Sequence, residues 1–149
     1  MCRLLLCDKK YYNNVGRHYL ERFLNHLEKE CGGHSNGICF VKDGRVTTVR
    51  KSIALKNQDI IRELYLNQPD WFMYHTRIAS VGCISNSNAH PYWNKNKTFV
   101  LCMNGTESKI GDLADGLGIT DTELIFRNLN TFNINEEVLT KLSSKFLGF

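Results

Sequence analysis

The sequence predicts one α+β domain, and three observations support this prediction. A length of 149 residues suits one domain. The share of apolar residues, 42%, and of charged residues, 23%, is that of an ordinary globular protein. Short apolar runs that suit strands occur at the start and in the middle of the chain, with helical patterns between and after them. This order of elements favours a compact layered α+β protein.

Several classes of protein are not expected. No apolar stretch is long enough to span a bilayer, and no signal peptide is visible at the start, so we expect no membrane attachment and a cytoplasmic location. The net charge of +4 is spread along the chain, which gives no specific case for nucleic acid. Six cysteines without a secretory signal favour free thiols in a reducing compartment: Cys2, Cys7, Cys31, Cys39, Cys83 and Cys102.

Metal and cofactor binding are not expected either. Cys31 and His34 have a ligand-like spacing, but no second pair of ligands complements them. Gly32 and Gly33 between them predict the end of a helix instead. Cys7, Cys39 and Cys102 lie in apolar runs and are expected in the core.

The first half of the chain alternates between strand and helix signals. Residues 2–8 suit a buried strand, and residues 11–31 suit a helix because apolar side chains recur at helical spacing. Residues 38–41 and 46–50 read as two strands, and the Asp43-Gly44 dipeptide between them is a strong hairpin signal. A short amphipathic helix over 58–67 should end before Pro69.

The second half begins with an aromatic strand over 71–77 and a long polar loop over 81–96. A buried strand over 98–103 should lead into Asn104-Gly105. The region 108–147 suits helices in two or three pieces, with Thr120 as a cap and Glu123 as its capping-box partner. The last residues, 146–149, look like the start of another strand.

The residue behind the initiator methionine is Cys2. Cysteine is small enough for Met1 to be removed, which would leave Cys2 with both a thiol and a free α-amine. Their reference pKa values are about 8.5 and about 7.7–8.0, so near neutral pH the amine can be a base beside a nucleophile. Taken alone, however, Cys2 is also consistent with a structural role, as a small apolar residue at the start of a core strand.

Polar residues gather at the ends of four separate predicted elements. Cys2 opens the first strand, His75-Thr76-Arg77 closes a middle strand, Asn104-Gly105 closes another, and residues 120–123 open a helix. Element ends are where a rigid scaffold can assemble a site. Each residue alone also suits a structural role: Arg77 a surface cation, Asn104-Gly105 a hairpin turn, and Asp121 a helix N-terminal acid.

These pieces together resemble the class II glutamine amidotransferases, a branch of the N-terminal nucleophile hydrolases. The matching pieces occur in the family's order and span residues 2 to about 130: Met1-Cys2, residues 75–82, Asn88-Ala89-His90-Pro91, Asn104-Gly105 and residues 120–123. The resemblance implies a fold of αββα layers over one domain, residues 1–149. It also implies glutamine as substrate, with hydrolysis to glutamate and ammonia.

The resemblance assigns roles to the matched residues. Cys2 would attack the side-chain amide, and the Asn104 amide and Gly105 N–H would stabilise the oxyanion. Arg77, helped by the Ser80 hydroxyl, would bind the α-carboxylate, and Asp121 the α-ammonium. His75, Thr76 and His90 would support the site. Tyr92-Trp93 suits either a cover over the pocket or an ordinary packed pair.

The sequence departs from the family pattern in three respects. Domains of this family usually run well past 149 residues, so this one would be either a minimal version or a C-terminally truncated one. Met103 stands where a histidine often precedes Asn-Gly, and Val81 stands where some members carry a polar residue. No acceptor domain is visible, so ammonia would pass to a separate synthase in trans. The alternatives are a stand-alone amidase on another γ-glutamyl amide, or a non-catalytic ligand-binding or regulatory relative.

Overall fold

The computed structural model describes residues 2–131, 142 and 144–148. Within them the chain is a mixed α+β protein, as expected, and it has two antiparallel sheets and five helices. The elements follow the order β1 (Arg3–Asp8), α1 (Lys9–Val15), α2 (Arg17–Cys31), β2 (Ser35–Lys42), β3 (Arg45–Ser52), α3 (Asn57–Asn67), β4 (Trp71–Arg77), β5 (Tyr92–Trp93), β6 (Val100–Asn104), α4 (Ser108–Gly116), α5 (Asp121–Thr131) and β7 (Lys145–Gly148).

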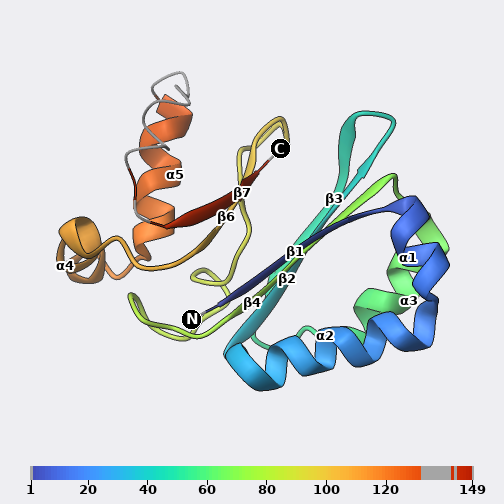
Figure 1. The fold of residues 1–149 in the computed structure, drawn as a ribbon. Helices are drawn as coiled ribbons and strands as arrows, with labels where there is room; N and C mark the ends of the chain where they lie inside the picture. Colours follow the sequence, from blue (N-terminus) through green and yellow to red (C-terminus); the bar gives the residue numbers. More distant parts are fainter. Residues whose placement is uncertain (1, 132–141, 143, 149) are drawn as a thin grey trace.

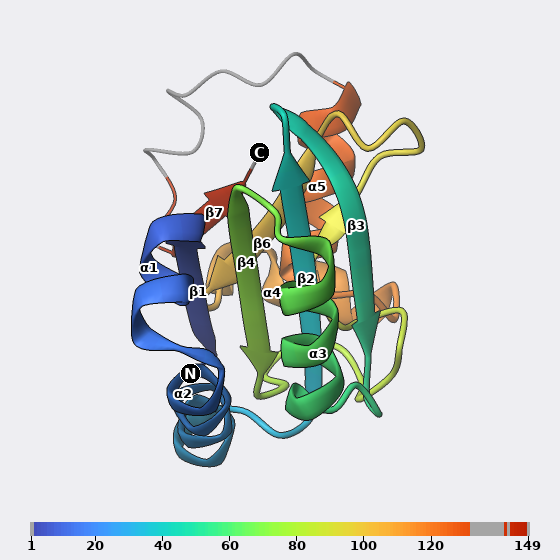
Figure 2. The same ribbon diagram turned by 90° about the vertical axis from the view of Figure 1, so that its right-hand side faces the viewer.

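The elements form four layers (Figure 1). The first sheet has the strand order β1-β4-β2-β3, and the second has the order β5-β6-β7. Helices α1, α2 and α3 cover the outer face of the first sheet, while α4 and α5 lie beyond the second sheet, as the view in Figure 2 also shows. The two sheets therefore face each other across an inner layer.

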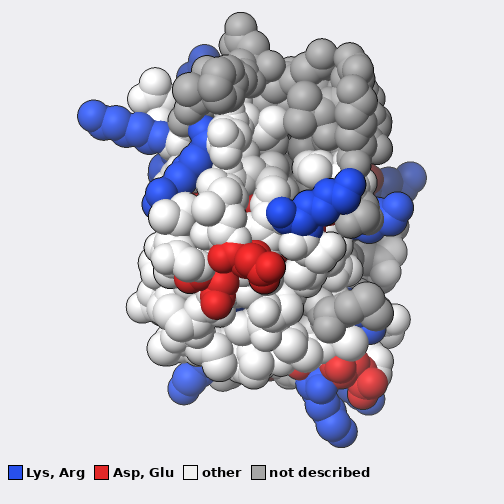
Figure 3. Space-filling model, turned by 90° about the vertical axis from the view of Figure 1, so that its left-hand side faces the viewer, with Lys and Arg blue, Asp and Glu red and all other residues white. Residues whose placement is uncertain are grey.

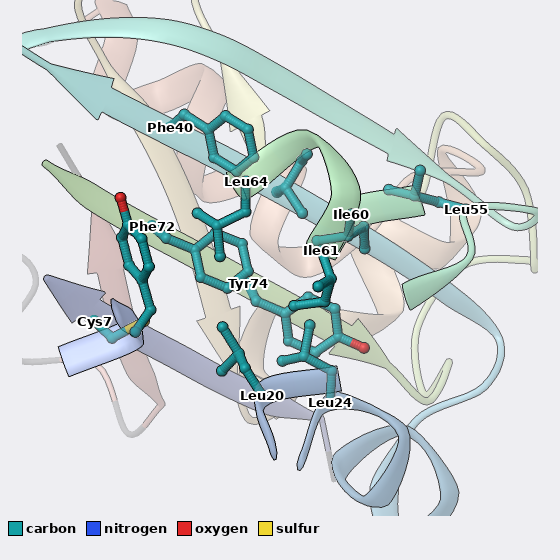
Figure 4. Close-up of a cluster of buried hydrophobic side chains, with 12 residues drawn as sticks. Cys7, Leu20, Leu24, Phe40, Leu55, Ile60, Ile61, Leu64, Phe72 and Tyr74 are labelled. Carbon is teal, nitrogen blue, oxygen red and sulfur yellow. The ribbon is translucent and has the colours of Figure 1, made fainter. Parts of the chain in front are cut away.

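The outer face of the first sheet carries the largest apolar cluster (Figure 4). Alternate residues of β2 and β4, namely Ile38, Phe40, Phe72 and Tyr74, pack there against the three helices. The helices contribute fully buried side chains such as Leu24. Truncating a buried leucine of this kind costs about 2–5 kcal/mol, so this cluster fixes the position of the sheet.

The inner face of the first sheet is formed by the residues between these. Cys39 and Met73 pack there against Val100 and Cys102 of β6. Because side chains alternate along a strand, Asn104 continues the Val100–Cys102 row and faces the first sheet. Cys2, one residue before β1, continues the Leu4 row on the same inner face. The inner layer is thus apolar along its length and becomes polar at one end.

Most predicted elements are confirmed. The hairpin turns at Asp43-Gly44, where both residues have positive φ. The strand over 71–77 and the helix before Pro69 lie where they were expected. In the region 108–147 two helices are present, although residues 132–141 and 143 lie outside the described part. The last strand begins at Lys145 and pairs with β6.

Two predictions need correction. The helix expected over 11–31 is two helices, because the chain breaks at Gly16, whose φ of 79° and ψ of 157° are not helical. The loop expected over 81–96 contains the short strand β5, which pairs with β6. A strand of two residues is too short to show the alternating hydrophobic pattern that identifies a strand in a sequence.

The remaining expectations concern cysteines, charge and membranes. All six cysteines are free, and Cys7, Cys39 and Cys102 are buried, as predicted. On the face shown in Figure 3, Lys and Arg side chains are scattered around a largely uncharged surface with a small acidic group near its centre. In the described part of the chain, no helix has the length and apolar character needed to cross a bilayer.

Candidate functional site

Cys2 lies at the polar end of the inner layer. Its side chain is buried, with 8% of the residue exposed, and its thiol donates to the Ile78 carbonyl oxygen at 3.6 Å. Burial raises the pKa of this thiol, while the hydrogen bond to Ile78 and the charge of Arg77 act in the opposite direction. Asp121 raises the same pKa, so Arg77 and Asp121 both act on Cys2 electrostatically.

Antiparallel pairing brings Arg77 to this end. Arg3 pairs with Thr76, so the residue before Arg3 and the residue after Thr76 meet at the same edge of the sheet. Arg77 is 3% exposed, and burial lowers its pKa, while Tyr92, Cys2 and Asp121 raise it. The strand register therefore places Arg77 opposite Cys2 at this edge, where its charge acts on the thiol.

The Arg77 guanidinium also organises the loop that follows β4. It donates to three successive carbonyl oxygens: those of Val81 at 2.7 Å, Gly82 at 3.2 Å and Cys83 at 3.2 Å. A guanidinium has five N–H donors, so two remain for other partners. Sequence reasoning assigned Arg77 to a ligand carboxylate and missed this second task.

Ser80 joins two of the predicted segments directly. Its hydroxyl lies 2.9 Å from the Thr106 hydroxyl, just beyond Asn104-Gly105. The loop after β4 and the turn after β6 therefore touch. Gly105 has a φ of 144°, a conformation that favours glycine. The Asn104 Oδ1 atom is buried and has no hydrogen-bond partner among the described residues.

Asp121 is held at the start of α5. Its Oδ2 accepts from the Glu107 N–H at 2.8 Å and its Oδ1 from the Thr122 N–H at 2.9 Å. Burial raises the pKa of this carboxyl, and the two backbone hydrogen bonds lower it. The predicted cap is present, because Thr120 Oγ1 accepts from the Glu123 N–H at 3.0 Å.

His75 and His90 form a buried pair next to β6. His75 Nε2 lies 3.3 Å from the Met103 carbonyl oxygen and 3.2 Å from His90 Nδ1. The Met103 carbonyl oxygen can only accept a hydrogen bond, and in the contact between the two rings one nitrogen donates and the other accepts. Burial lowers the pKa of His75 to about 3 and lowers that of His90 well below its usual range. Both rings are therefore neutral at pH 7.

Thr76 lies on the other face of the sheet, turned towards the helices. Its Oγ1 accepts from the Gly33 N–H at 3.3 Å and fills the space above Gly32. Thr76 therefore fixes the connection between α2 and β2 and does not face Cys2.

His34, three residues after Cys31, accepts from the Ala79 N–H through Nδ1 at 2.9 Å. Within the described residues no group of three or more metal-ligating side chains is placed to hold an ion.

Two further residues near the site escaped sequence reasoning. Gly37 of β2 lets the His90 segment lie against the sheet, since a Cβ at Gly37 would sit 1.6 Å from the His90 carbonyl oxygen. Lys51 of β3 donates to the Ser87 carbonyl oxygen at 2.7 Å, and its ammonium lies 3.9 Å from the centre of the Tyr92 ring. Burial lowers the pKa of Lys51 to about 8. Neither residue belongs to a local motif.

Comparisons with known proteins add little about activity. No model of a known protein family matches the sequence. An uncharacterized protein of Methanocaldococcus jannaschii is 33% identical to this chain over 138 residues, an alignment that covers 85% of this chain and 37% of the relative. The chain thus spans little more than a third of the curated relative that it matches. The description of that relative assigns no activity to it.

Proposed function

We propose that this chain is a glutamine amidotransferase domain of class II, which hydrolyses the side-chain amide of glutamine through Cys2. The proposal depends on one observation: Cys2, Arg77 and Asp121 come from three segments that are distant in sequence and act on one another electrostatically, and Asn104 ends the row of β6 residues that faces the same sheet. The four layers, with the nucleophile on the inner face of a sheet, support an N-terminal nucleophile hydrolase fold as part of the same proposal.

In this mechanism, removal of Met1 frees the α-amine of Cys2. The Cys2 sulfur forms a bond to the amide carbon, and the thiol proton passes through the α-amine to the leaving nitrogen. The carbon–nitrogen bond then breaks and ammonia leaves. Water hydrolyses the thioester to glutamate and restores the thiol. Because burial raises the thiol pKa, a nearby base is needed to take this proton.

The oxyanion would be stabilised by the Asn104 side-chain amide and the Gly105 N–H. Such donors are worth about 3–4 kcal/mol each in comparable sites. The substrate's α-carboxylate would take the remaining N–H groups of Arg77 and the Ser80 hydroxyl. Asp121 would bind the α-ammonium, since each of its oxygens has a second lone pair beyond the backbone hydrogen bond. A cation and an anion in one pocket suit a zwitterionic amino acid.

The proposal includes a reducing compartment and a partner. All six cysteines are free, and a nucleophilic thiol must stay reduced. Ammonia would pass to an acceptor synthase in trans. The test is glutamate release from glutamine by the purified protein, with mass spectrometry to establish that Met1 is absent. Cys2→Ala should abolish release, whereas the matched change Cys31→Ala, at the end of α2, should leave it intact.

A glutamine-like electrophile, 6-diazo-5-oxo-L-norleucine, should label Cys2 and no other cysteine. Protein that lacks Met1 and neither releases glutamate nor accepts this label would contradict the proposal. The buried thiol with its raised pKa also suits a second candidate, a non-catalytic domain that binds an amino acid. That candidate predicts glutamine binding by calorimetry without glutamate release.

A further inference from the structure

A buried carboxylate, that of Glu107, lies between two parts of the proposed site. Glu107 is 7% exposed and immediately precedes α4. Its backbone N–H donates to Asp121 Oδ2 at 2.8 Å, and its side-chain Oε1 accepts from the Ser144 N–H at 2.6 Å. One residue thus contacts α5 through its backbone and the segment before β7 through its side chain.

Ser144 in turn lies directly on Gly105. A Cβ atom placed on Gly105 would lie 2.5 Å from Ser144 Oγ, 2.8 Å from its Cβ and 3.1 Å from its Cα. The next residue, Lys145, pairs with Asn104 in the β6–β7 ladder. The position of Ser144 therefore limits where the Gly105 backbone can lie. Ser144 Oγ is buried and has no hydrogen-bond partner among the described residues.

We propose that Glu107 is a positioning residue that fixes the spacing between Asp121 and the Asn104-Gly105 corner. This inference rests on the proposed function, in which Asp121 binds the substrate's ammonium and Gly105 donates to the oxyanion. The Glu107 N–H orients the Asp121 carboxylate. The Glu107 carboxylate holds Ser144 against Gly105, which aims the Gly105 N–H.

The physical reason is that the two groups act on opposite ends of one substrate. An error of about 1 Å in the relative placement of reacting groups can reduce a rate about 100-fold. Asp121 lies in α5 and Gly105 in the turn after β6. Glu107 donates to Asp121 and accepts from Ser144, which packs against Gly105. Glu107 has no place in the family pattern that the sequence suggested, and its partner lies 37 residues away.

The first arm of the test needs no catalysis. Amide hydrogen exchange measured by mass spectrometry should show faster exchange in peptides covering residues 104–107 and 142–146 in Glu107→Ala than in the wild type. Glu107→Gln, which keeps a side-chain oxygen as acceptor, should exchange nearly as slowly as the wild type. Glu30→Ala, which removes an exposed acid at the end of α2, is the matched control. Unchanged exchange in Glu107→Ala would overturn the proposal.

The second arm measures turnover of glutamine. Glu107→Ala should lower kcat about 10–100-fold, whereas Glu107→Gln should stay within about fivefold of the wild type. Alkylation of Cys2 by iodoacetamide, which needs no oxyanion donors, should change little, while labelling by 6-diazo-5-oxo-L-norleucine should slow in parallel with kcat. Equal slowing of both reagents would indicate general disruption and contradict a positioning role.

A third variant, Glu107→Asp, provides the test if Glu107→Ala does not fold. It keeps the carboxylate charge and only shortens the side chain. It should show the same selective loss of kcat. The exchange results can agree with the contact between Glu107 and Ser144 while the wild type never releases glutamate. That outcome would contradict the proposed function, and with it the positioning role of Glu107, but not the contact itself. The two failures are therefore distinguishable.

Discussion

The side chains of Arg77 and Asp121 both form hydrogen bonds with the protein's own backbone. Arg77 donates to three loop carbonyls, and Asp121 accepts two backbone N–H groups. Both side chains are therefore fixed in place without a substrate. A preorganised site of this kind loses little conformational entropy on binding, which favours recognition of small ligands.

Replacing Asp121 by asparagine tests recognition of the α-ammonium. Asp121→Asn keeps the shape and one carbonyl oxygen but removes the charge and one of the two acceptors of backbone N–H groups, so KM for glutamine should rise about 10–100-fold. The measurement compares glutamine with glutaramate, which lacks the α-ammonium. The variant should lose the preference for glutamine that we predict for the wild type. The exposed control Asp112→Asn should keep it, and an unchanged preference in Asp121→Asn would assign the ammonium to another residue.

The His75–His90 pair predicts how stability depends on pH. Burial lowers the pKa of both rings, that of His75 to about 3, whereas an unfolded histidine has a pKa of about 6.5. Below about pH 6.5 the unfolded chain binds protons that the folded protein does not, so stability is fully present above this pH and is lost as the pH falls towards the folded pKa values. Each ring can contribute up to about 1.4 kcal/mol per pH unit.

Urea denaturation at pH 7.5, 6.0 and 5.0 measures this dependence. His75→Asn should flatten the decrease in the free energy of unfolding, even if it destabilises the protein at every pH. His26→Asn, which changes an exposed ring on α2, should leave the slope as it is in the wild type. A steep decrease that persists in both His75→Asn and His90→Asn would assign the pH dependence to other groups.

At the scale of elements, Gly16 separates α1 from α2. Its φ of 79° and ψ of 157° lie in a region that only glycine occupies readily, and no atom lies within 4 Å of the position of an added Cβ. Gly16→Ala should therefore destabilise the protein by about 1–3 kcal/mol through backbone strain alone.

Thermal and chemical denaturation measure this cost, and a second glycine provides the control. Gly116, near the end of α4, also has open space around a Cβ but a backbone without positive φ. Gly116→Ala should be neutral or slightly stabilising. Equal effects of the two substitutions would contradict the assignment of the Gly16 cost to its dihedral angles.

The same elements show what the sequence can and cannot predict. Helical spacing and the Asp43-Gly44 turn predicted α2 and the β2–β3 hairpin because their signals lie within a few residues. The break at Gly16 was missed because an isolated glycine inside a helical pattern is often tolerated. Family-like motifs drew attention to Arg77 and Asp121, but Glu107, Ser144, Gly37 and Lys51 depend on contacts between distant segments. Such contacts leave no local pattern.

At the scale of the molecule, the proposed site lies where the two sheets meet. Arg77 ends β4 of the first sheet, and Cys2 directly precedes β1 of the same sheet. Asn104 ends β6 of the second sheet, and Asp121 begins α5, which lies beyond that sheet (Figure 1). The apolar inner layer, which includes Met73, holds the sheets together along their length. A ligand bound at the polar end would add a second connection between them and should stabilise the whole molecule.

Under the proposed function, glutamine should therefore raise the melting temperature of Cys2→Ala, which would bind glutamine without hydrolysing it. At a concentration about 100 times Kd, binding to the folded state alone adds about 2.7 kcal/mol, or roughly 5–10 °C for a chain of this size. D-Glutamine should give a much smaller shift, because it cannot present its carboxylate and ammonium to Arg77 and Asp121 together with its amide to Asn104. The double variant Cys2→Ala with Asp121→Asn should lose most of the shift. A shift that is the same for both enantiomers, or that survives the loss of Asp121, would mean that the ligand binds elsewhere and does not connect the two sheets.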